Sequence, residues 1–422
     1  MNNLHGSPLR GNAVVGQSGG PTAAINATLA GVIRGALDEI AAGGAIARLY
    51  GMRNGVDGLL REDLVELDKL FTEDTDALER LTLTPAAALG SCRKKLPAPG
   101  AKDEAEIMDK LFAIFAKYDI RYFFYIGGTD SMDTVAKVSA YAEKVGYPIR
   151  VMGVPKTIDN DLVGTDHTPG FGSAAKYIAV TMQEILRDTA VYTVPAVTIV
   201  EIMGRDAGWL TASSALGRAV TGMEPDLVYL PERNFSYEEF FADLREALSR
   251  HPNVVVAVSE GIHLADGTFV GEGTQSGAVD VFGHRYLAGT AKALELAVKA
   301  EIGCKVRSIE LNLPQRCAGH LVSAQDITES LEVGRNAVVA AVAGVSREMM
   351  TICRVSSAPY AFEIRHEDIF KIANQTKYVP DEFINSRGNH VTDECVAYLL
   401  PLIKGERYPA YVDGLPCQWI LK

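Results

Sequence analysis

Short runs of apolar residues, each followed by a longer stretch with helical spacing, recur along this chain and limit what it can fold into. The run RYFFYI at 121–126 precedes the turn GGTDS and the stretch MDTVAKVSAYAEKVG, and another run, IRVMGV, ends at Pro155. This alternation is typical of a mostly parallel sheet that is covered by helices. The sequence therefore predicts the α/β class.

The N-terminal part of the chain follows the same pattern. Residues 13–16 are predicted to form a short buried strand, QSGG a turn, and the chain from Pro21 onward a helix. The apolar side chains on one face of that helix would be Ile25, Leu29, Val32 and Ile33.

The second half of the chain predicts a second layered unit. Four apolar runs, PAVTIVEIMG, DLVYLPE, NVVVAVSEG and KVRSIELNL, have the character of strands. Helices are predicted at 207–220, 237–250 and 290–299, and the stretch 325–350 is rich in Ala, Val and Glu at helical spacing. The tail after Val355 mixes strand-like pieces with Gly and Pro, and we assign no structure to it.

The length of 422 residues is too great for one ordinary domain, so we expect two domains of similar size that share a cleft. No obvious linker separates them, which predicts that the chain crosses between the domains more than once. We expect one domain at approximately 1–165 with part of 325–400. The other is expected at approximately 166–324 with part of the C-terminal tail.

The composition of the chain excludes some classes of function. A formal net charge of -12 argues against general binding to nucleic acid or to anionic membranes, because both need an excess of Lys and Arg. No stretch approaches the roughly 20 apolar residues of a membrane span, and the start MNNLHGSPLRGN lacks the layout of a signal peptide. The 6 cysteines form no CxxC pair, which favours reduced thiols. We expect a cytoplasmic protein.

Two glycine-rich loops, GQSGGPT and IGGTDS, each follow a predicted strand and precede a helix. Backbone N–H groups and the helix dipole at such a point suit phosphate groups. Neither loop matches the dinucleotide-binding pattern GxGxxG or the Walker pattern GxxxxGK[ST], so neither standard nucleotide fingerprint is present. The missing dinucleotide pattern disfavours a nicotinamide oxidoreductase. Glycines at these turns also serve tight packing in any such fold, so the loops alone leave both interpretations open.

The segment VPKTIDNDLVGTDHTPGFGSA is more informative. It places Lys156, Asp159 and Asp161 directly beyond a predicted strand, at the edge of an open α/β sheet where ligands bind. A carboxylate beside a lysine is often only a solvated surface pair. Here the neighbouring Thr and Asn can orient the carboxylates, and Gly and Pro can fix the loop, so we predict a functional site.

The sequence resembles the phosphofructokinase family, and within it the pyrophosphate-dependent branch. The resemblance rests on GQSGGPTAAIN, LGSCR, IGGTDS, PKTIDND, EIMGRDAGWL, VSEG and PQR, in family order from about residue 14 to 316. It implies the phosphofructokinase fold, with two Rossmann-like three-layer domains and mostly parallel sheets. The first domain would bind the phosphoryl donor, pyrophosphate, and the second the sugar phosphate. The C-terminal hundred residues match less clearly.

The resemblance implies a Mg2+-dependent phosphotransferase of glycolysis and gluconeogenesis. It would move a phosphoryl group reversibly from pyrophosphate to the C1 oxygen of fructose 6-phosphate. Asp159 would be the general base, and Asp161 would orient it or hold a metal-bound water. Lys156 stands where ATP-using relatives commonly have Gly, and its ammonium can neutralise pyrophosphate oxygens.

Asp130 stands where ATP-dependent relatives carry Gly, near the place of an ATP α-phosphate. Two like charges about 4 Å apart cost on the order of 4 kcal/mol at an effective dielectric near 20, and pyrophosphate escapes this penalty. An alternative role for Asp130 is to cap the helix expected near Ser131. Many relatives have a magnesium-linked Asp where this chain has Thr129, so we assign the metal to Asp130 with Thr129.

Family correspondence assigns the remaining binding residues. Those for pyrophosphate are Gly19, Gly20, Arg93, Asp130 and Lys156. Those for the sugar phosphate are Thr157, Asp159, Asp161, Met203, Gly204, Arg205, Glu260 and Arg316. In relatives the arginine of PQR often reaches across a subunit interface, which implies a homo-oligomer, either dimer or tetramer.

Two alternatives on the same fold are an ATP-dependent 6-phosphofructokinase and a catalytically silent regulatory subunit. Asp130 and Lys156 disfavour the first, and the presence of Asp159 disfavours the second. The sequence leaves open the effectors and a second acceptor such as sedoheptulose 7-phosphate.

Overall fold

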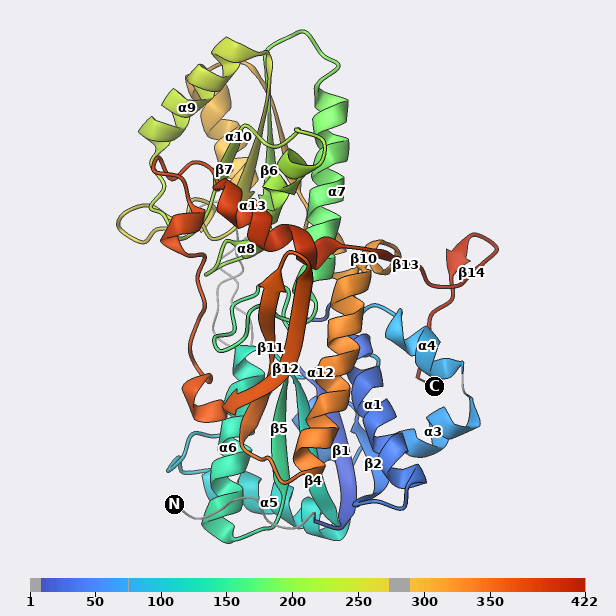
Figure 1. The fold of residues 1–422 in the computed structure, drawn as a ribbon. Coiled ribbons are helices and arrows are strands. Elements are labelled where there is room, and N and C mark those ends of the chain that lie inside the picture. Colours follow the sequence, from blue (N-terminus) through green and yellow to red (C-terminus); the bar gives the residue numbers. More distant parts are fainter. Residues whose placement is uncertain (1–8, 75, 273–288, 422) are drawn as a thin grey trace.

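The structure, a computed structural model, describes residues 9–74, 76–272 and 289–421. Two mostly parallel sheets lie one beyond the other along the molecule, and helices cover both (Figure 1). The predicted α/β class with mostly parallel sheets is thereby confirmed. Within these residues, no helix has the length and apolar character needed to cross a bilayer.

The larger sheet has seven strands among the described residues, in the order β12-β11-β5-β4-β1-β2-β3. They are β1 (Gly11–Gln17), β2 (Ile46–Met52), β3 (Leu64–Glu66), β4 (Ile120–Gly127), β5 (Arg150–Pro155), β11 (Glu348–Ser357) and β12 (Tyr360–Asp368). Strands from β2 to β11 pair in parallel, whereas β3 and β12 are antiparallel edges. Parallel pairing brings the carboxyl ends of β1, β4 and β5 to one edge of the sheet.

Helices cover both faces of this sheet because side chains alternate along each strand. Val15 belongs to the core beneath α1 and α12, whereas Val14 belongs to the core beneath α5 and α6. The helices are α1 (Ile25–Ala41), α2 (Gly55–Leu60), α3 (Leu67–Glu73), α4 (Ala77–Thr82), α5 (Glu104–Lys117), α6 (Thr129–Val145) and α12 (Ala324–Val342).

Helices α1 and α12 lie side by side and approach closely at two glycines (Figure 1). A Cβ atom at Gly31 would lie 2.2 Å from the carbonyl oxygen of Leu331, and one at Gly334 would lie 2.1 Å from that of Thr28. Only glycine permits backbones to come this near. The contact fixes a helix of the C-terminal third on the N-terminal sheet.

The smaller sheet has four described strands, all parallel, in the order β7-β8-β6-β9. They are β6 (Ala196–Ile202), β7 (Leu227–Tyr229), β8 (Asn253–Ser259) and β9 (Lys305–Glu310). Its helices are α7 (Phe171–Thr189), α8 (Trp209–Ala212), α9 (Tyr237–Arg250), α10 (Thr290–Glu301), α11 (Pro314–Cys317) and α13 (Asp393–Leu399). All four predicted strands are present, and the helix predicted at 237–250 has the predicted bounds.

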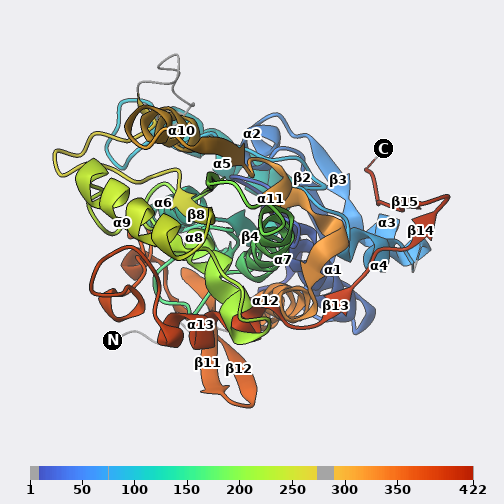
Figure 2. The same cartoon turned by 90° about the horizontal axis from the view of Figure 1, so that it is seen from above.

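The C-terminal part of the chain contributes to both sheets. Strands β11 and β12 extend the larger sheet, and α13 packs in the core of the smaller one. The remaining described strands are short: β10 (Val322–Ser323), β13 (Glu406–Arg407), β14 (Tyr411–Val412) and β15 (Leu415–Pro416). Short 3-10 helices lie at Ser213–Ala219, Gly319–Leu321, Ile369–Lys371, Asp381–Phe383 and Leu400–Ile403. Figure 2 shows β14 and β15 at the outer rim, away from both sheets. The domain boundaries stay a prediction.

Two predicted helix starts are wrong. Helix α1 begins at Ile25 and not at Pro21, because Thr22 forms a turn: its hydroxyl accepts from the backbone N–H of Ala24, and its carbonyl accepts from that of Ala86. Helix α6 begins inside the GGTDS motif, at Thr129. Asp130 therefore lies in the first turn of α6, and the proposed role of Asp130 as its N-cap residue is wrong.

Two other helix predictions need correction. The stretch 207–220 is divided into the short helix α8 and a 3-10 turn, Ser213–Ala219. The stretch 325–350 is helical only to Val342, and strand β11 starts at Glu348. Gly344, with φ 104, gives the backbone the turn that separates helix from strand.

Candidate active site

Loops that follow β1, β4 and β5 lie next to one another. The backbone N–H of Ser18 donates to the carbonyl of Ile126 at 2.9 Å, and that of Lys156 donates to the carbonyl of Gly127 at 3.0 Å. A Cβ atom at Gly128 would lie 3.6 Å from the carbonyl oxygen of Lys156. The two glycine loops and the TIDND segment thus form one surface at the carboxyl edge of the larger sheet.

Lys156 is buried against the first glycine loop, with an exposed fraction of 2%. Its Nζ donates to the carbonyl oxygen of Gly20 at 2.5 Å. Gly19 has φ 76, and a Cβ atom there would lie 3.3 Å from Nζ, so the glycine leaves room for the lysine. Burial lowers the pKa of Lys156 to about 8, although Asp159 and Asp161 oppose the shift.

Thr157 orients Asp159. Its hydroxyl lies 3.4 Å from Oδ2 of Asp159 and accepts from the Asp159 backbone N–H at 3.1 Å. The backbone of Thr157 is itself held, because its N–H donates to the carbonyl of Pro169 and its carbonyl accepts from the Thr168 hydroxyl at 2.8 Å. The loop therefore folds back on itself and presents Asp159 from a fixed base.

Asp159 and Asp161 are two carboxylates in one poorly solvated place. Burial raises the pKa of Asp159 above its usual range, and Lys156 opposes the shift. Burial and then the charge of Asp159 raise the pKa of Asp161. Oδ1 of Asp161 is buried and has no hydrogen-bond partner among the residues that the structure describes. A carboxylate whose pKa is raised in this way is a stronger base once it is ionised, which suits a group that takes a proton from a hydroxyl.

Arg93 and Arg316 lie near the same loops as Lys156 and add two positive charges to this place. A Cβ atom at Gly20 would lie 3.6 Å from Nη1 of Arg316. Burial and the charge of Arg93 lower the pKa of Arg316, while Asp159 and Glu260 act in the opposite direction. Arg93 reaches this place because the segment before it binds the glycine loop: the Gly19 backbone N–H donates to the carbonyl of Cys92.

Arg316 lies on α11 of the same chain as the rest of this cluster. The predicted reach of this arginine across a subunit interface is therefore not needed to bring it to Gly20. A second subunit stays a prediction.

The segment after β6 faces the loop after β8. The Gly204 backbone N–H donates to Oε1 of Glu260 at 3.2 Å, and the Met203 N–H donates to Oε1 of Gln315 at 3.1 Å. Burial raises the pKa of Glu260 to about 8, helped by the charge of Asp159 and opposed by that of Arg205. The predicted sugar-phosphate residues thus adjoin Asp159 through Glu260 and Arg316.

Asp130 and Thr129 differ in their surroundings. Asp130 forms an ion pair with Lys95 at 3.3 Å, and both side chains are half-exposed. The hydroxyl oxygen of Thr129 is buried and finds no hydrogen-bond partner in the described part of the chain. The neighbouring Lys94 also pairs with a carboxylate and lies 3.6 Å from Asp57. Lys95 partly compensates the charge of Asp130, which sequence reasoning missed.

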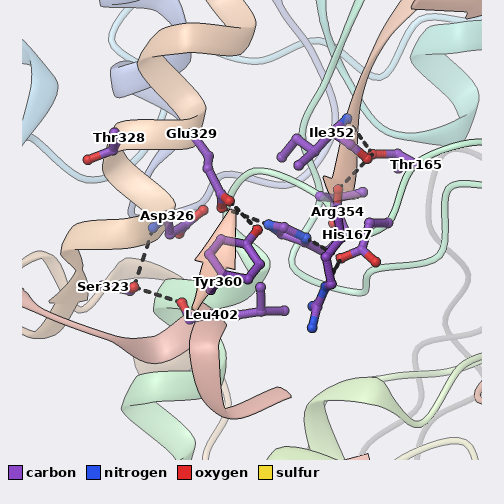
Figure 3. A network of polar contacts seen from close by, with 12 residues as sticks. Thr165, His167, Ser323, Asp326, Thr328, Glu329, Ile352, Arg354, Tyr360 and Leu402 are labelled. Atoms are coloured by element: carbon purple, nitrogen blue, oxygen red, sulfur yellow. Dashed lines mark hydrogen bonds and ion pairs between the residues drawn. The ribbon is translucent and has the colours of Figure 1, made fainter. Parts of the chain in front are cut away.

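A buried network of charges supports the loop from behind (Figure 3). His167 lies between Asp166 and Glu329, with its ring nitrogens 2.8 and 2.7 Å from their carboxylate oxygens. Arg354 pairs with Asp166 at 3.0 Å, and the hydroxyl of Tyr360 binds Glu329. The network joins the loop to α12, β11 and β12. Its partners lie too far apart in the sequence for any local pattern to reveal it.

The chain is similar to known proteins along nearly its whole length. A family model described as Phosphofructokinase matches residues 12–341. A protein of Halomonas elongata named pyrophosphate--fructose 6-phosphate 1-phosphotransferase is 41% identical over 407 residues, which cover 96% of this chain and 94% of that protein. A Xanthomonas campestris protein of the same name is 43% identical over 412 residues, covering 96% of this chain and 95% of that one.

A solved structure has the same fold. The crystal structure of a pyrophosphate-dependent phosphofructokinase from Nitrosospira multiformis matches with a TM-score of 0.86 at 38% identity. The match covers 96% of this chain and 95% of that chain.

Proposed function

The chain belongs to the phosphofructokinase family, and we propose from this that it transfers a phosphoryl group from pyrophosphate to the C1 oxygen of fructose 6-phosphate. Two relatives that match nearly the whole chain carry the corresponding name. The observation that carries the proposal is the burial of Lys156 against Gly19 and Gly20, three residues before Asp159. Donor site and base would thus share one loop.

Asp159 acts as the general base for the sugar hydroxyl in this proposal. Phosphoryl transfer through a loose transition state needs little covalent help, but it needs in-line positioning and an acceptor for the hydroxyl proton. The hydrogen bond from Thr157 orients the carboxylate, and burial raises its pKa so that it takes a proton more readily. Asp161 is the second carboxylate of the pair and orients Asp159.

Cations neutralise the phosphate groups. Lys156, Arg93 and Arg316 form a positive cluster beside the loops after β1 and β5, where pyrophosphate oxygens would bind. On the other side, Glu260 accepts hydrogen bonds from sugar hydroxyls, and Arg205 and Arg316 hold the sugar phosphate. The backbone of Met203 and Gly204 forms the part of the site next to Glu260.

The donor is pyrophosphate rather than ATP because of Asp130 and Lys156. Lys156 fills the space beside Gly20, and the carboxylate of Asp130 repels a third phosphate. The ion pair with Lys95 weakens that repulsion without removing it, because both side chains are half-exposed and the pair is screened by water.

The family generally uses a divalent metal, and we propose Mg2+ held at Asp130 and Thr129, with Asp161 through water. Among the described residues, no group of three His, Cys, Asp or Glu side chains could hold a metal alone. The buried, unpartnered oxygens of Thr129 and Asp161 are oxygen donors of the kind Mg2+ prefers, and phosphate oxygens would supply other ligands. When bound, Mg2+ would neutralise charge on the transferred group.

Further features belong to the same proposal. The reaction is readily reversible, because the bonds broken and formed are of comparable energy. The protein is cytoplasmic, which agrees with 6 cysteines that are all free thiols. It acts as a homo-oligomer, with the donor domain at approximately 1–165 with part of 325–400 and the sugar-phosphate domain at approximately 166–324 with part of the tail.

A donor-swap assay tests the proposal. With Mg2+ and fructose 6-phosphate, the purified protein is expected to form fructose 1,6-bisphosphate from pyrophosphate and little or none from ATP. The double variant Asp130→Gly, Lys156→Gly is expected to lose pyrophosphate activity and gain relative use of ATP. Equal rates with both donors in the wild-type protein would refute the roles of Asp130 and Lys156.

A further inference from the structure

Lys377 lies across the loop that carries Asp159 and Asp161. Its Nζ donates to Oδ1 of Asn160 at 3.1 Å, to the carbonyl of Thr165 at 3.2 Å and to the carbonyl of Asp166 at 2.7 Å. An ammonium has three N–H donors, and these three acceptors use all of them. The side chain therefore ties the outgoing half of the loop, at Asn160, to the returning half.

Asn160 stands between the two carboxylates and is fully buried, with an exposed fraction of 0%. Its backbone is left-handed, with φ 55, a conformation that Asn adopts more readily than most residues. The direction of this turn decides where the side chains on either side of it point. A contact that holds the Asn160 amide thus holds the geometry of Asp159 and Asp161 together.

Lys377 is itself fixed by its backbone. Its N–H donates to the carbonyl of Asp161 at 2.7 Å, and its carbonyl accepts from the indole N–H of Trp209 at 3.1 Å. The ammonium lies 5.3 Å from the centre of the Trp209 ring, a distance at which a cation is attracted to the ring. Two residues on, the Val379 N–H donates to Glu232 at 2.9 Å. The backbone at and after Lys377 is therefore held in place by these contacts.

The two carbonyls that Lys377 binds are equally fixed. Thr165 exchanges hydrogen bonds with the backbone of Ile352 (Figure 3), and Asp166 pairs with Arg354. The returning half of the loop is therefore part of the larger sheet's framework, and Lys377 extends that framework to Asn160.

We propose that Lys377 is a positioning residue that holds Asp159 and Asp161 in their reactive arrangement through Asn160. The inference rests on the proposed function, since it takes Asp159 as the base. Lys377 acts on Asp159 through Asn160, and its charge also stabilises the carboxylate of Asp161. A misplacement of about 1 Å at a reacting group can lower the rate by about 10²-fold, which sets the scale of the effect.

The test compares Lys377→Met, Asn160→Gly and the double variant in the pyrophosphate assay. Methionine keeps the length of the side chain and removes the ammonium. Glycine accepts the φ of Asn160 without strain and removes only the amide that Lys377 binds. Lys371→Met is the control, because Lys371 is an exposed lysine of the same segment that pairs with Glu367.

We expect each single variant to lower kcat by about 10- to 100-fold, with KM for both substrates changed by less than about threefold. The double variant should be little worse than Lys377→Met alone, because Lys377→Met already removes the contact that Asn160→Gly removes. The control should keep wild-type kcat. A lysine that served stability alone would lower the melting temperature and leave kcat unchanged.

Other outcomes overturn the inference. A folded Lys377→Met protein with wild-type kcat, or with raised KM and unchanged kcat, refutes it while leaving the proposed function intact. Should Lys377→Met fail to fold, Asn160→Gly decides, and an unchanged kcat in that variant refutes the inference. A wild-type protein without pyrophosphate-dependent activity refutes the proposed function and the inference with it.

Discussion

Oε2 of Glu329 lies 2.7 Å from Nε2 of His167, and both side chains are only 1% exposed. Oδ2 of Asp166 approaches the other ring nitrogen at 2.8 Å. Carboxylates on both sides of the ring favour an imidazolium, in which both nitrogens carry protons and donate hydrogen bonds. Burial alone would lower the pKa of His167, but the charges of Glu329 and Asp166 outweigh it and raise the pKa to about 9.

This pKa predicts how stability changes with pH. An unfolded histidine has a pKa of about 6.5, so the contribution of His167 is fully present below about pH 6.5 and is lost as the pH rises through about 9. The melting temperature of His167→Gln should therefore lie several degrees below that of the wild type at pH 6, and the difference should shrink by pH 9.5. Calorimetry at a series of pH values measures it.

The matched control is His366→Gln. His366 also binds a carboxylate, Glu348, but its side chain is 41% exposed. Its melting temperature should stay within about one degree of the wild type at every pH, since exposed pairs contribute little. A His167→Gln difference that is the same at pH 6 and pH 9.5 would contradict a charged ring.

Removing the proposed base should abolish most of the activity. Asp159→Asn is expected to lower kcat by about 10² to 10⁴-fold, because the amide cannot take the hydroxyl proton. The melting temperature should not fall, since burial already opposes the charged carboxylate. Asp188→Asn, an exposed carboxylate on α7, is the control and should keep wild-type activity.

The wild-type pH profile checks the same assignment. A base must be unprotonated, so kcat/KM should rise with pH through the pKa of Asp159, which lies above the usual value of about 3.9. The acid limb of the profile should disappear in Asp159→Asn. If the acid limb has the same shape in Asp159→Asn as in the wild type, the limb belongs to another group.

Lys156 should set the alkaline limit of pyrophosphate use. Its pKa in the unliganded protein is about 8, and the ammonium must be charged to bind the donor. We expect kcat/KM for pyrophosphate to fall as the pH rises through about 8. Lys156→Met should lower kcat/KM by about 10² to 10³-fold and lack this limb. Lys144→Met, an exposed lysine that pairs with Glu104, should behave as the wild type.

The contact between α1 and α12 should tolerate no side chain. Gly334→Ala would place a methyl group 2.1 Å from the carbonyl oxygen of Thr28, which is backbone and cannot step aside. We expect a loss of about 1 to 3 kcal/mol in the free energy of unfolding, measured with urea. Val339→Ala, on the exposed side of α12, should change it by less than about 0.5 kcal/mol. Equal stability of the two variants would mean that the helices can move apart.

The strands and loops of the site were predictable because their signals are local. The apolar run before GGTDS and the one before PKTIDND each specify a strand and its end within a dozen residues. Parallel strands then bring those ends together. This step also explains why Lys156 lies beside Gly19 and Gly20, since all three lie at strand ends.

The supports of the site were not predictable, because they depend on pairs far apart in the chain. Lys377 is 217 residues from Asn160, and Glu329 is 162 residues from His167. No spacing rule connects such partners, and the tail that supplies Lys377 has no clear periodicity. The ion pair of Lys95 with Asp130 was missed for a related reason, since a run of exposed lysines is usually only solvated.

The order of strands in the larger sheet has a consequence for synthesis on the ribosome. Strand β5 pairs with β11, and about 190 residues separate the two in the sequence. A nascent chain exposes one side of β5 until residue 348 and its successors have left the exit tunnel. During that interval the open strand can pair with other nascent chains, so slow translation or crowded polysomes should lower the yield of folded protein.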